Sequence, residues 1–307
     1  MEHIPVLLKE AIEYLSVKKD GIYVDMTLGG GGHSSAILSL LNNKGHLYSF
    51  DVDDYSIERA KEKLDKLNKS NYTIIKSNFR FIKERLSELG IYEVDGILYD
   101  LGVSSFDFDI KEKGFSYNLD GPLDMRMDKS FKLTAFDVVN KYSEKEIADI
   151  IYKYGDERYS REIAKNIAIS RKQKPIESTF ELVDIIKKSL PLKELSKKGH
   201  PAKKTFEALR VYVNDELGAL KDSLYSSIEL LKKGGRIVVI DFQRDEDYIV
   251  KNVFKEYYSS ENIKGLPVNP EEPPLKRITK KPISPTDEEI NNNFRSHSAL
   301  MRVVEKN

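Results

Sequence analysis

The stretch that decides the fold reads Ile22-Tyr23-Val24-Asp25-Met26-Thr27-Leu28-Gly29-Gly30-Gly31-Gly32-His33-Ser34-Ser35. Its first five residues form a short apolar run typical of a buried strand, and residues 34–41 read as a short helix. Four consecutive glycines join the two. A strand, a glycine-rich turn and a helix, in this order, predict the start of an α/β sheet that binds a ligand at the carboxyl end of its first strand.

The same alternation continues along the chain. We expect strands at 46–51, 72–75 and 96–100, with helices at 55–67 and 81–89 between them. Strands that alternate with helices imply right-handed crossovers and a mainly parallel, Rossmann-like sheet. After a long interruption, further elements of this sheet are expected: a buried strand at 236–242, a helix at 248–258 and a closing edge strand at 299–304.

The interruption has a helical pattern. Residues 106–130 read as a loop rich in Asp and Gly, and nothing in 131–195 has a strand pattern. Two capping boxes start helices there, Ser143 with Glu146 and Ser178 with Glu181. A single long helix is expected from Pro201 to Leu231, ended by Gly234-Gly235. We therefore predict an all-helical substrate-recognition domain over 106–212, inserted in a discontinuous sheet domain made of 1–105 and 213–307.

Composition excludes several classes of protein. The 307 residues are 40% hydrophobic and 33% charged, which is typical of a folded globular chain. No apolar run approaches the roughly 18 residues of a membrane span, and the N-terminus lacks a signal-peptide pattern, so a cytoplasmic protein is expected. Cysteine is absent, which removes disulfides, thiolate metal sites and a cysteine nucleophile. The five histidines lack close ligand spacing, so no metal site is predicted from them, and a metal held by carboxylates around the predicted site stays open.

Charge is balanced over the chain but segregated along it. Fifty Lys and Arg match fifty Asp and Glu, which argues against indiscriminate coating of nucleic acid. Residues 187–210 nevertheless carry a net charge of +6, and residues 100–128 carry −4. The basic segment is either a solvated face or a phosphate-binding surface. On the second interpretation, the candidate RNA contacts are Lys197, Lys198, Lys203, Lys204 and Arg210.

Two kinds of ligand fit the glycine turn. Glycines followed by an acid about 20 residues later, here Asp51, suit both a dinucleotide and S-adenosylmethionine (AdoMet), because the acid can bind a ribose diol. The spacing departs from Gly-x-Gly-x-x-Gly, since Gly29 and Gly31 lead to Ser34. Asp25 also precedes the glycines, where a carboxylate favours a cationic ligand and repels a pyrophosphate. AdoMet is favoured over a nicotinamide cofactor, and a turn without any ligand stays open.

The predicted site of chemistry is Tyr99-Asp100-Leu101-Gly102-Val103-Ser104-Ser105, which follows the fourth strand. A carboxylate or carbonyl there can accept a hydrogen bond from an exocyclic amine and so assist its attack on a sulfonium methyl. Methylation at a cytosine ring carbon normally needs a cysteine adduct, which this chain cannot form. Asp100, Ser104 and Ser105 are therefore candidate catalytic residues for amine methylation, with a simple turn or capping role as the alternative for Asp100.

The chain resembles a known family, the bacterial small-subunit ribosomal RNA cytosine-N4 methyltransferases of the RsmH or MraW type. The matching motifs run almost end to end and include Asp25-x-Thr27-Leu28-Gly29-x-Gly31-Gly32-His33-Ser34, Asp100-Leu101-Gly102-Val103-Ser104-Ser105, Pro122-Leu123-Asp124-Met125-Arg126-Met127 and His200-Pro201-Ala202-Lys203-Lys204. The resemblance implies a class I methyltransferase domain interrupted by a helical domain. It also implies AdoMet as donor, and as acceptor a cytosine in the decoding region of small-subunit (16S) ribosomal RNA, free or in the 30S particle.

The resemblance further implies a set of cofactor contacts at Gly31, Gly32, His33, Asp51, Phe79, Asp100 and Asp107. Asp107 departs from the family, which usually has Gln there. The family sequence ISFHSLEDR is also replaced by Ile240-Asp241-Phe242-Gln243-Arg244-Asp245-Glu246-Asp247-Tyr248. This second departure leaves open an AdoMet-binding ribosome-assembly or sensor protein with lost or altered turnover. A DNA amine methyltransferase is a further alternative.

Other residues have two interpretations. Arg126, between Asp124 and Asp128, belongs either to an internal ion-pair network or to the cofactor cleft, where it would hold Asp100 or a phosphate of the RNA. Aromatic residues near the predicted site would stack an extruded base or pack in the core; they are Phe106, Phe108, Phe115 and Tyr117. The sequence leaves the oligomeric state, monomer or homodimer, open.

Overall fold

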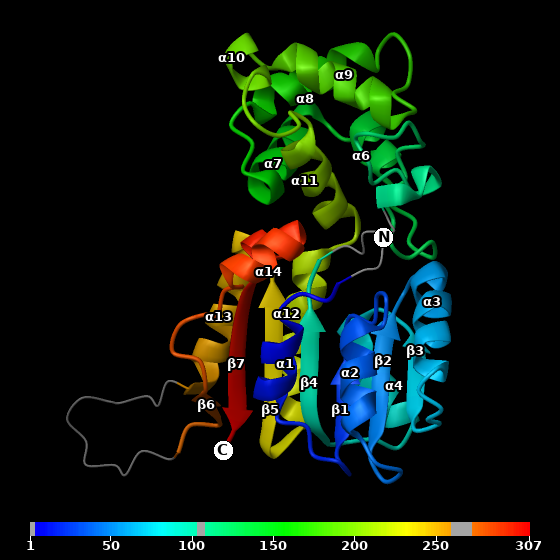
Figure 1. The fold of residues 1–307 in the computed structure, drawn as a ribbon. Helices are drawn as coiled ribbons and strands as arrows, with labels where there is room; N and C mark the ends of the chain where they lie inside the picture. The colour runs from blue at the N-terminus through cyan, green and yellow to red at the C-terminus, as the bar shows by residue number, and fades with distance from the viewer. Residues whose placement is uncertain (1–3, 103–107, 259–271) are drawn as a thin grey trace, which may run out of the picture. The chain divides into compact units, whose positions relative to one another are not determined.

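The computed structural model describes residues 4–102, 108–258 and 272–307. The chain divides into two compact units (Figure 1). The first, called the sheet unit below, comprises Met1–Gly102 and Leu217–Asn307. The second, the helical unit, comprises Val103–Glu216.

The sheet unit is built on a seven-stranded sheet in the order β3-β2-β1-β4-β5-β7-β6. The strands are β1 Ile22–Asp25, β2 His46–Asp51, β3 Tyr72–Lys76, β4 Val94–Asp100, β5 Leu231–Asp241, β6 Leu275–Arg277 and β7 Leu300–Lys306. The first five pair in parallel, and β7 runs antiparallel to both β5 and β6. This confirms the predicted α/β fold class with a mainly parallel sheet.

One strand assignment was incomplete. The strand expected to close the sheet, β7, has β6 outside it. Because β6 is three residues long and follows a proline-rich stretch, it has no alternation of apolar and polar residues from which to predict it.

Helices cover both faces of this sheet. On one face α1, α2 and α3 bury Ala11, Ile37 and Leu64 in one apolar cluster. On the other, α4, α12 and α13 contribute to a second cluster. Successive residues of β1 alternate between them, Tyr23 in the first and Val24 in the second, as the two-residue period of a strand requires. The helices are α1 Leu8–Leu15, α2 Gly32–Leu40, α3 Asp54–Asp65, α4 Ile82–Glu88, α12 Glu216–Leu230, α13 Arg244–Tyr258 and α14 Asp287–Asn292, with short 3₁₀ turns η1 Phe79–Phe81 and η3 Phe294–Ser298.

The helical unit has its own apolar core. Its helices are α6 Ala135–Lys141, α7 Glu144–Gly155, α8 Ser160–Ser170, α9 Thr179–Ser189, α10 Leu192–Leu195 and α11 Lys203–Val213, with a 3₁₀ turn η2 Lys111–Lys113. The predicted capping boxes at Ser143 and Ser178 are confirmed, since both reciprocal hydrogen bonds form at each. A third box, at Thr134, was not predicted because Asp137 occupies the position that Glu or Gln usually takes.

The single long helix expected from 201 to 231 is wrong in two respects. It is divided between α11 and α12, because Asp215 takes a left-handed backbone conformation, with φ of 47°. The buried Asn214 side chain stabilises this break through hydrogen bonds to the backbone at Met125 and Met127. In addition, Gly234-Gly235 lies inside β5, and α12 already ends at Leu230. Over the described part of the chain, no helix combines the length and apolar character needed to cross a membrane.

Candidate active site

The glycine turn joins β1 to α2 at the carboxyl edge of the sheet. Packing of the protein's own atoms explains two of its glycines. A Cβ atom on Gly32 would lie 2.2 Å from Cγ of Pro5, and one on Gly31, where φ is +72°, would lie 3.1 Å from Cβ of Ala60. At Gly29, where φ is +46°, the nearest atom of the described residues to such a Cβ atom would be a backbone oxygen at 3.8 Å. The turn is therefore held against α3 and the N-terminal segment and, within the described part of the chain, is open at Gly29.

Asp25 lies beneath this turn. Its carboxylate is fully buried and accepts hydrogen bonds from the Ser34 hydroxyl (2.6 Å) and the Thr27 backbone N–H (3.1 Å). Burial raises the pKa of Asp25 above its ordinary value, although these bonds and the nearby His33 oppose the rise. Asp25 therefore anchors the turn from below, and the expectation that it meets a cationic ligand, directly or through water, stays a prediction.

Asp51 ends β2 beside the same turn. One carboxylate oxygen accepts the backbone N–H of Gly29 at 2.9 Å, and the other accepts the N–H of Asp53 at 2.9 Å. These two bonds fix the orientation of the carboxylate next to the opening at Gly29. This is the geometry expected of an acid that receives the hydroxyls of a ribose.

His33 and Asp100 form the central pair of the site. Nδ1 of His33 lies 3.3 Å from Oδ2 of Asp100, and Nε2 lies 3.1 Å from the carbonyl oxygen of Val6. Both ring nitrogens thus face acceptors, which favours the doubly protonated imidazolium. Burial alone would lower the pKa of His33, but the hydrogen bond and charge of Asp100, with the charge of Asp25, outweigh it and raise the pKa. His33, which the family resemblance gives as a cofactor contact, therefore orients Asp100.

The second carboxylate oxygen of Asp100 is unmatched within the described part of the chain. Oδ1 is buried and has no hydrogen-bond partner within the described part of the chain, whereas Oδ2 meets His33. The backbone N–H of Asp100 donates to the Thr27 hydroxyl at 2.7 Å, which ties the end of β4 to the segment after β1. Buried polar atoms are nearly always hydrogen-bonded in native proteins, so an unmatched acceptor at this edge fits a ligand that brings an N–H donor.

Phe79 starts η1 just after β3, where the side chain of Asn78 caps the turn. Its ring packs edge-on against Tyr99 of β4, with 6.1 Å between ring centroids. Phe79 is thus placed at the same edge as Asp51 and Asp100, although two strands separate β3 from β4 in the sheet. Four predicted residues, Ser104, Ser105, Phe106 and Asp107, lie outside the described residues.

The altered segment 241–248 contains a second buried acid at this edge. Asp241 ends β5 with 1% of its surface exposed, and neither carboxylate oxygen has a partner among the described residues. Burial, followed by the charges of Asp247 and Glu246, raises the pKa of Asp241 to about 8. The acids kept from the family have structural roles: Glu246 accepts two backbone N–H groups at the start of α13, and Asp247 forms a two-point ion pair with Arg302.

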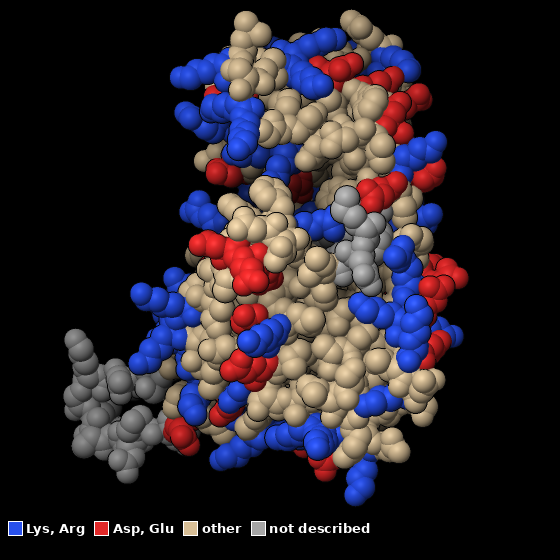
Figure 2. All heavy atoms as spheres, in the orientation of Figure 1, with Lys and Arg blue, Asp and Glu red and all other residues tan. Residues whose placement is uncertain are grey.

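The basic segment of the helical unit divides into two groups. Lys197, Lys198, Lys203 and Lys204 are exposed; Lys197 pairs with Glu194, and Lys204 donates to the carbonyl of Asp156. Figure 2 shows Lys and Arg side chains gathered on the side of this unit that carries α7 and α10. Arg210, in contrast, is 8% exposed and pairs at two points with Glu216. Its prediction as a phosphate contact is corrected, because a buried and paired guanidinium holds α11 in place.

Of the two interpretations of Arg126, the structure supports the internal ion-pair network. Its guanidinium pairs at two points with Asp124 and also donates to the backbone carbonyls of Lys129 and Phe131. This corrects its assignment as an RNA contact or a holder of Asp100.

Among the candidate stacking residues, Phe115 is buried in the core, and Tyr117 is stacked on His200 with 4.4 Å between ring centroids. The described residues hold no group of three or more potential metal ligands.

The fold and the site together define a class of protein. A mainly parallel sheet with an antiparallel β7 has a glycine turn after β1 and carboxylates at the ends of β2 and β4. This is the class I, Rossmann-like methyltransferase fold.

Comparison with known proteins identifies the family. The sequence profile of the MraW methylase family matches residues 1–307, so the chain belongs to this family. It is 51% identical over 307 residues to "Ribosomal RNA small subunit methyltransferase H" of Streptococcus mutans serotype c, covering 99% of this chain and 97% of the relative. The protein of that name from Mycoplasma mycoides subsp. mycoides is 52% identical over 310 residues, with 100% and 99% covered. The resemblance inferred from the motifs is confirmed.

Proposed function

We propose that this protein transfers the methyl group of AdoMet to the exocyclic N4 amine of a cytosine in the decoding region of small-subunit (16S) ribosomal RNA. One observation carries the proposal: the chain matches a methylase family over its whole length and is about half identical to proteins named as methyltransferases of small-subunit ribosomal RNA. The absence of cysteine agrees with transfer to an amine, because transfer to a cytosine ring carbon normally uses a cysteine adduct.

The carboxyl edge of the sheet holds the cofactor in this proposal. Asp51 accepts hydrogen bonds from the ribose hydroxyls. The backbone of the turn at Gly31 and Gly32, together with His33, contacts the cofactor. Phe79 packs beside the ligand, and Asp100 presents its unmatched oxygen to an N–H donor. AdoMet supplies an electrophilic methyl group on a sulfonium. The unmatched oxygen of Asp100 and the open position at Gly29 support the fit.

Asp100 also has the proposed catalytic role. An amine nitrogen that gains a methyl group develops positive charge, and a carboxylate that accepts a hydrogen bond from the amine N–H stabilises that charge. His33 holds Oδ2 and leaves Oδ1 for this bond. The preorganised carboxylate therefore orients the nitrogen lone pair and opposes the charge that develops during transfer. Ser104 and Ser105 remain proposed catalytic residues from the family resemblance.

The proposed domains are the sheet domain for catalysis and the helical insertion for RNA recognition. Exposed lysines support this division, because Lys contacts to phosphate give affinity without reading sequence. Replacing Lys203 and Lys204 together with Ala should weaken RNA binding and flatten its salt dependence by about 1.4 in log–log slope, at about 0.7 for each phosphate contact on a single strand. Lys61→Ala, in an exposed part of α3, is the control. An unchanged slope contradicts the assignment of the surface.

Single-turnover methyl transfer tests the function as a whole. Purified protein is mixed with labelled AdoMet and small ribosomal subunits that lack the modification, and the labelled nucleotide is then identified by mass analysis. We expect label on N4 of one cytosine. AdoMet binding without label in the RNA would favour the assembly or sensor protein, and label in duplex DNA would favour a DNA methyltransferase.

Because the proposed substrate is ribosomal RNA, we place the protein in the cytoplasm. Its proposed partner is small-subunit ribosomal RNA, free or in the assembled 30S particle.

A further inference from the structure

The helical unit contains a pocket that none of the assignments above uses. It is an open pocket of about 530 Å³, within the size range of sites for small organic groups. Its lining residues come from the segment after Arg126, from α7 and from the end of α11. They are Ser130, Phe131, Lys132, Leu133, Tyr154, Tyr212, Val213 and Asp215.

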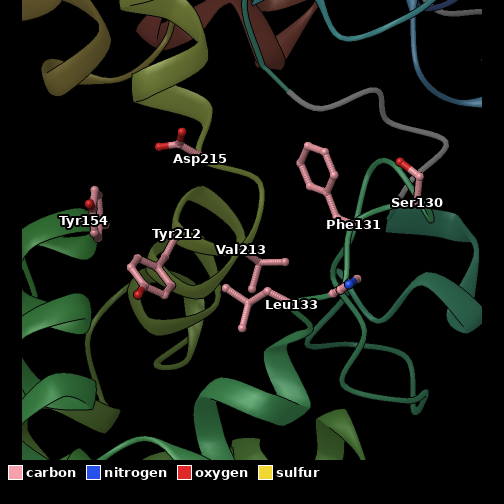
Figure 3. Close-up of a pocket in the computed structure, with 8 residues that line it drawn as sticks. Ser130, Phe131, Leu133, Tyr154, Tyr212, Val213 and Asp215 are labelled. Atoms are coloured by element: carbon pink, nitrogen blue, oxygen red, sulfur yellow. The ribbon is translucent and has the colours of Figure 1, made fainter.

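The lining combines flat aromatic walls with a polar rim. Figure 3 shows Tyr154 and Tyr212 on one side, Phe131 on the other, and Leu133 and Val213 between them. The rings of Tyr154 and Tyr212 lie 5.8 Å apart at 49° to each other. A planar group that enters the pocket thus meets aromatic surface, and its edge meets hydroxyl and carboxylate groups at the rim.

The pocket walls are held in place before any ligand arrives. Arg126 donates to the carbonyl oxygen of Phe131 at 2.6 Å, and its own orientation is set by the two-point pair with Asp124. On the opposite side, the buried Asn214 joins the end of α11 to the backbone at Met127. Tyr212 donates to the hydroxyl of Tyr142, and this bond, followed by burial, raises the pKa of Tyr212 to about 12, so its ring stays neutral. Such preorganisation lowers the entropic cost of binding.

Positive charge lies beside the aromatic surface. Lys132 lines the pocket, and the ammonium of Lys153 lies 4.8 Å from the centroid of the Tyr154 ring. Both lysines are exposed. Aromatic faces with adjacent cations are the combination with which proteins bind single-stranded nucleic acid, where bases stack on the rings and the cations meet phosphates.

We propose that this pocket binds an unpaired nucleobase of the RNA substrate, which stacks on Tyr154 and Tyr212 while Lys132 and Lys153 contact the adjoining phosphates. The proposal rests on the proposed RNA-directed function and deepens it. It gives Arg126 a positioning role, because the guanidinium holds the Phe131 wall and does not contact RNA itself. The site is distinct from the lysines at 197–204, which do not line the pocket.

The test compares three variants of two tyrosines on α7, one of which lines the pocket. Equilibrium binding of ten-nucleotide single-stranded RNAs is measured for the wild type, Tyr154→Ala, Tyr154→Phe and Tyr152→Ala. Tyr152 is the matched control, because it lies on the same helix with 62% of its surface exposed and does not line the pocket. We expect Tyr154→Ala to lose on the order of tenfold in affinity, and Tyr154→Phe and Tyr152→Ala to bind within about twofold of the wild type.

A second measurement locates the base directly. RNAs that carry 4-thiouridine are cross-linked by near-ultraviolet light, and cross-linked peptides are identified by mass spectrometry. Cross-links at Tyr154 or Tyr212 that disappear with excess unlabelled RNA support the proposal. Wild-type affinity in a folded Tyr154→Ala variant, or equal losses in the Ala and Phe variants, overturns it.

Methyl transfer to small subunits, measured together with RNA binding, distinguishes failure of the proposed function from failure of the pocket assignment. If the wild type labels small subunits and Tyr154→Ala binds RNA normally, the pocket assignment alone fails. If the wild type labels nothing, yet Tyr154→Ala weakens RNA binding and the cross-links are found, the assigned function fails and the nucleobase pocket stands.

Discussion

The ends of β4 and β5 present the same residue type at the same edge of the sheet in two opposite environments. Asp100 ends β4 and pairs in register with Ile240, the neighbour of Asp241 at the end of β5. Asp100 has a cationic partner in His33 and one unmatched oxygen. Asp241 has no partner for either oxygen among the described residues, and its pKa is raised to about 8.

The difference shows that position in the fold does not make an aspartate functional. A carboxylate that assists charge development needs a cation beside it and an oxygen left for the substrate, and Asp100 has His33 beside it and an unmatched Oδ1. A carboxyl without a counterion in a buried place keeps its proton near neutral pH and costs stability once it ionises. The comparison supports the proposed catalytic role of Asp100, and we regard Asp241 as a destabilising feature of this chain.

The largest expected effect comes from Asp100→Asn. The amide preserves the shape and a hydrogen bond to His33 but removes the negative charge, so turnover should fall on the order of 100-fold while RNA affinity changes little. Single-turnover methyl transfer and RNA binding are measured together. Asp95→Asn, at the opposite end of β4, is the control: Asp95 pairs with Lys18 and Lys232, so its loss should lower stability and leave turnover intact. Equal losses of turnover in the two variants would contradict the comparison.

A third carboxylate at this edge, Asp51, provides the next test. Asp51→Ala removes the proposed ribose contacts and the bond to Gly29, so the dissociation constant for AdoMet should rise about 10- to 100-fold, as expected for charge-assisted hydrogen bonds. Isothermal calorimetry with AdoMet and with its demethylated product measures this. The two acids would not have separate roles if Asp51→Ala lost no more affinity for AdoMet than Asp100→Asn.

Asp241→Ser, which restores the residue usual in the family, should stabilise the protein. Because the native pKa of Asp241 is raised, the native state keeps a proton that the unfolded chain releases, and wild-type stability falls as the pH rises from about 4 to about 8. The variant should lack this loss and be more stable at pH 9 by about 1–3 kcal/mol, with a smaller gap at pH 5.

Urea unfolding at several pH values measures that gap. Asp241→Asn, which keeps the volume, controls for the cavity that Ser leaves, and Asp245→Ser removes an exposed acid from the same segment. A gap that does not depend on pH would refute the assignment of the raised pKa to Asp241.

The smallest effect is expected for His33. Its pKa is raised in the folded state, so the ion pair with Asp100 contributes stability that is fully present below the pKa of the unfolded chain and is lost as the pH rises through the folded pKa. His33→Gln should therefore cost on the order of 1 kcal/mol more at pH 6 than at pH 9. Thermal unfolding across this range checks the sign, and a cost that grows with pH would contradict the pairing.

Local patterns predicted most of the sheet unit. The strands 22–26, 46–51, 72–75 and 96–100 were found close to their expected bounds, because buried parallel strands are short apolar runs between turn residues. The strand expected at 236–242 begins five residues earlier, at Leu231, and ends at Asp241. The break at Asp215 was not predictable in the same way. It depends on Asn214 reaching backbone atoms almost 90 positions away, and no local pattern of 201–231 contains that contact.

The candidate site was predicted unevenly for the same reason. The positions of Gly31, Asp51 and Asp100 followed from their places after strands, since parallel strands deliver their carboxyl ends to one edge. The states of side chains did not follow. Charge and spacing alone suggested Arg126 and Arg210 for RNA, yet each is engaged by a nearby acid in a two-point pair.

By itself, then, the sequence determined the strand and helix order, the place of the glycine turn and the family, because these depend on residues close together in the chain. Only the tertiary structure decided which acid has a cation beside it, which arginines are engaged, and that Phe131, Tyr154 and Tyr212 line one pocket. Those properties depend on distance, burial and the partners that folding brings together, and Coulomb and hydrogen-bond energies change with each of them.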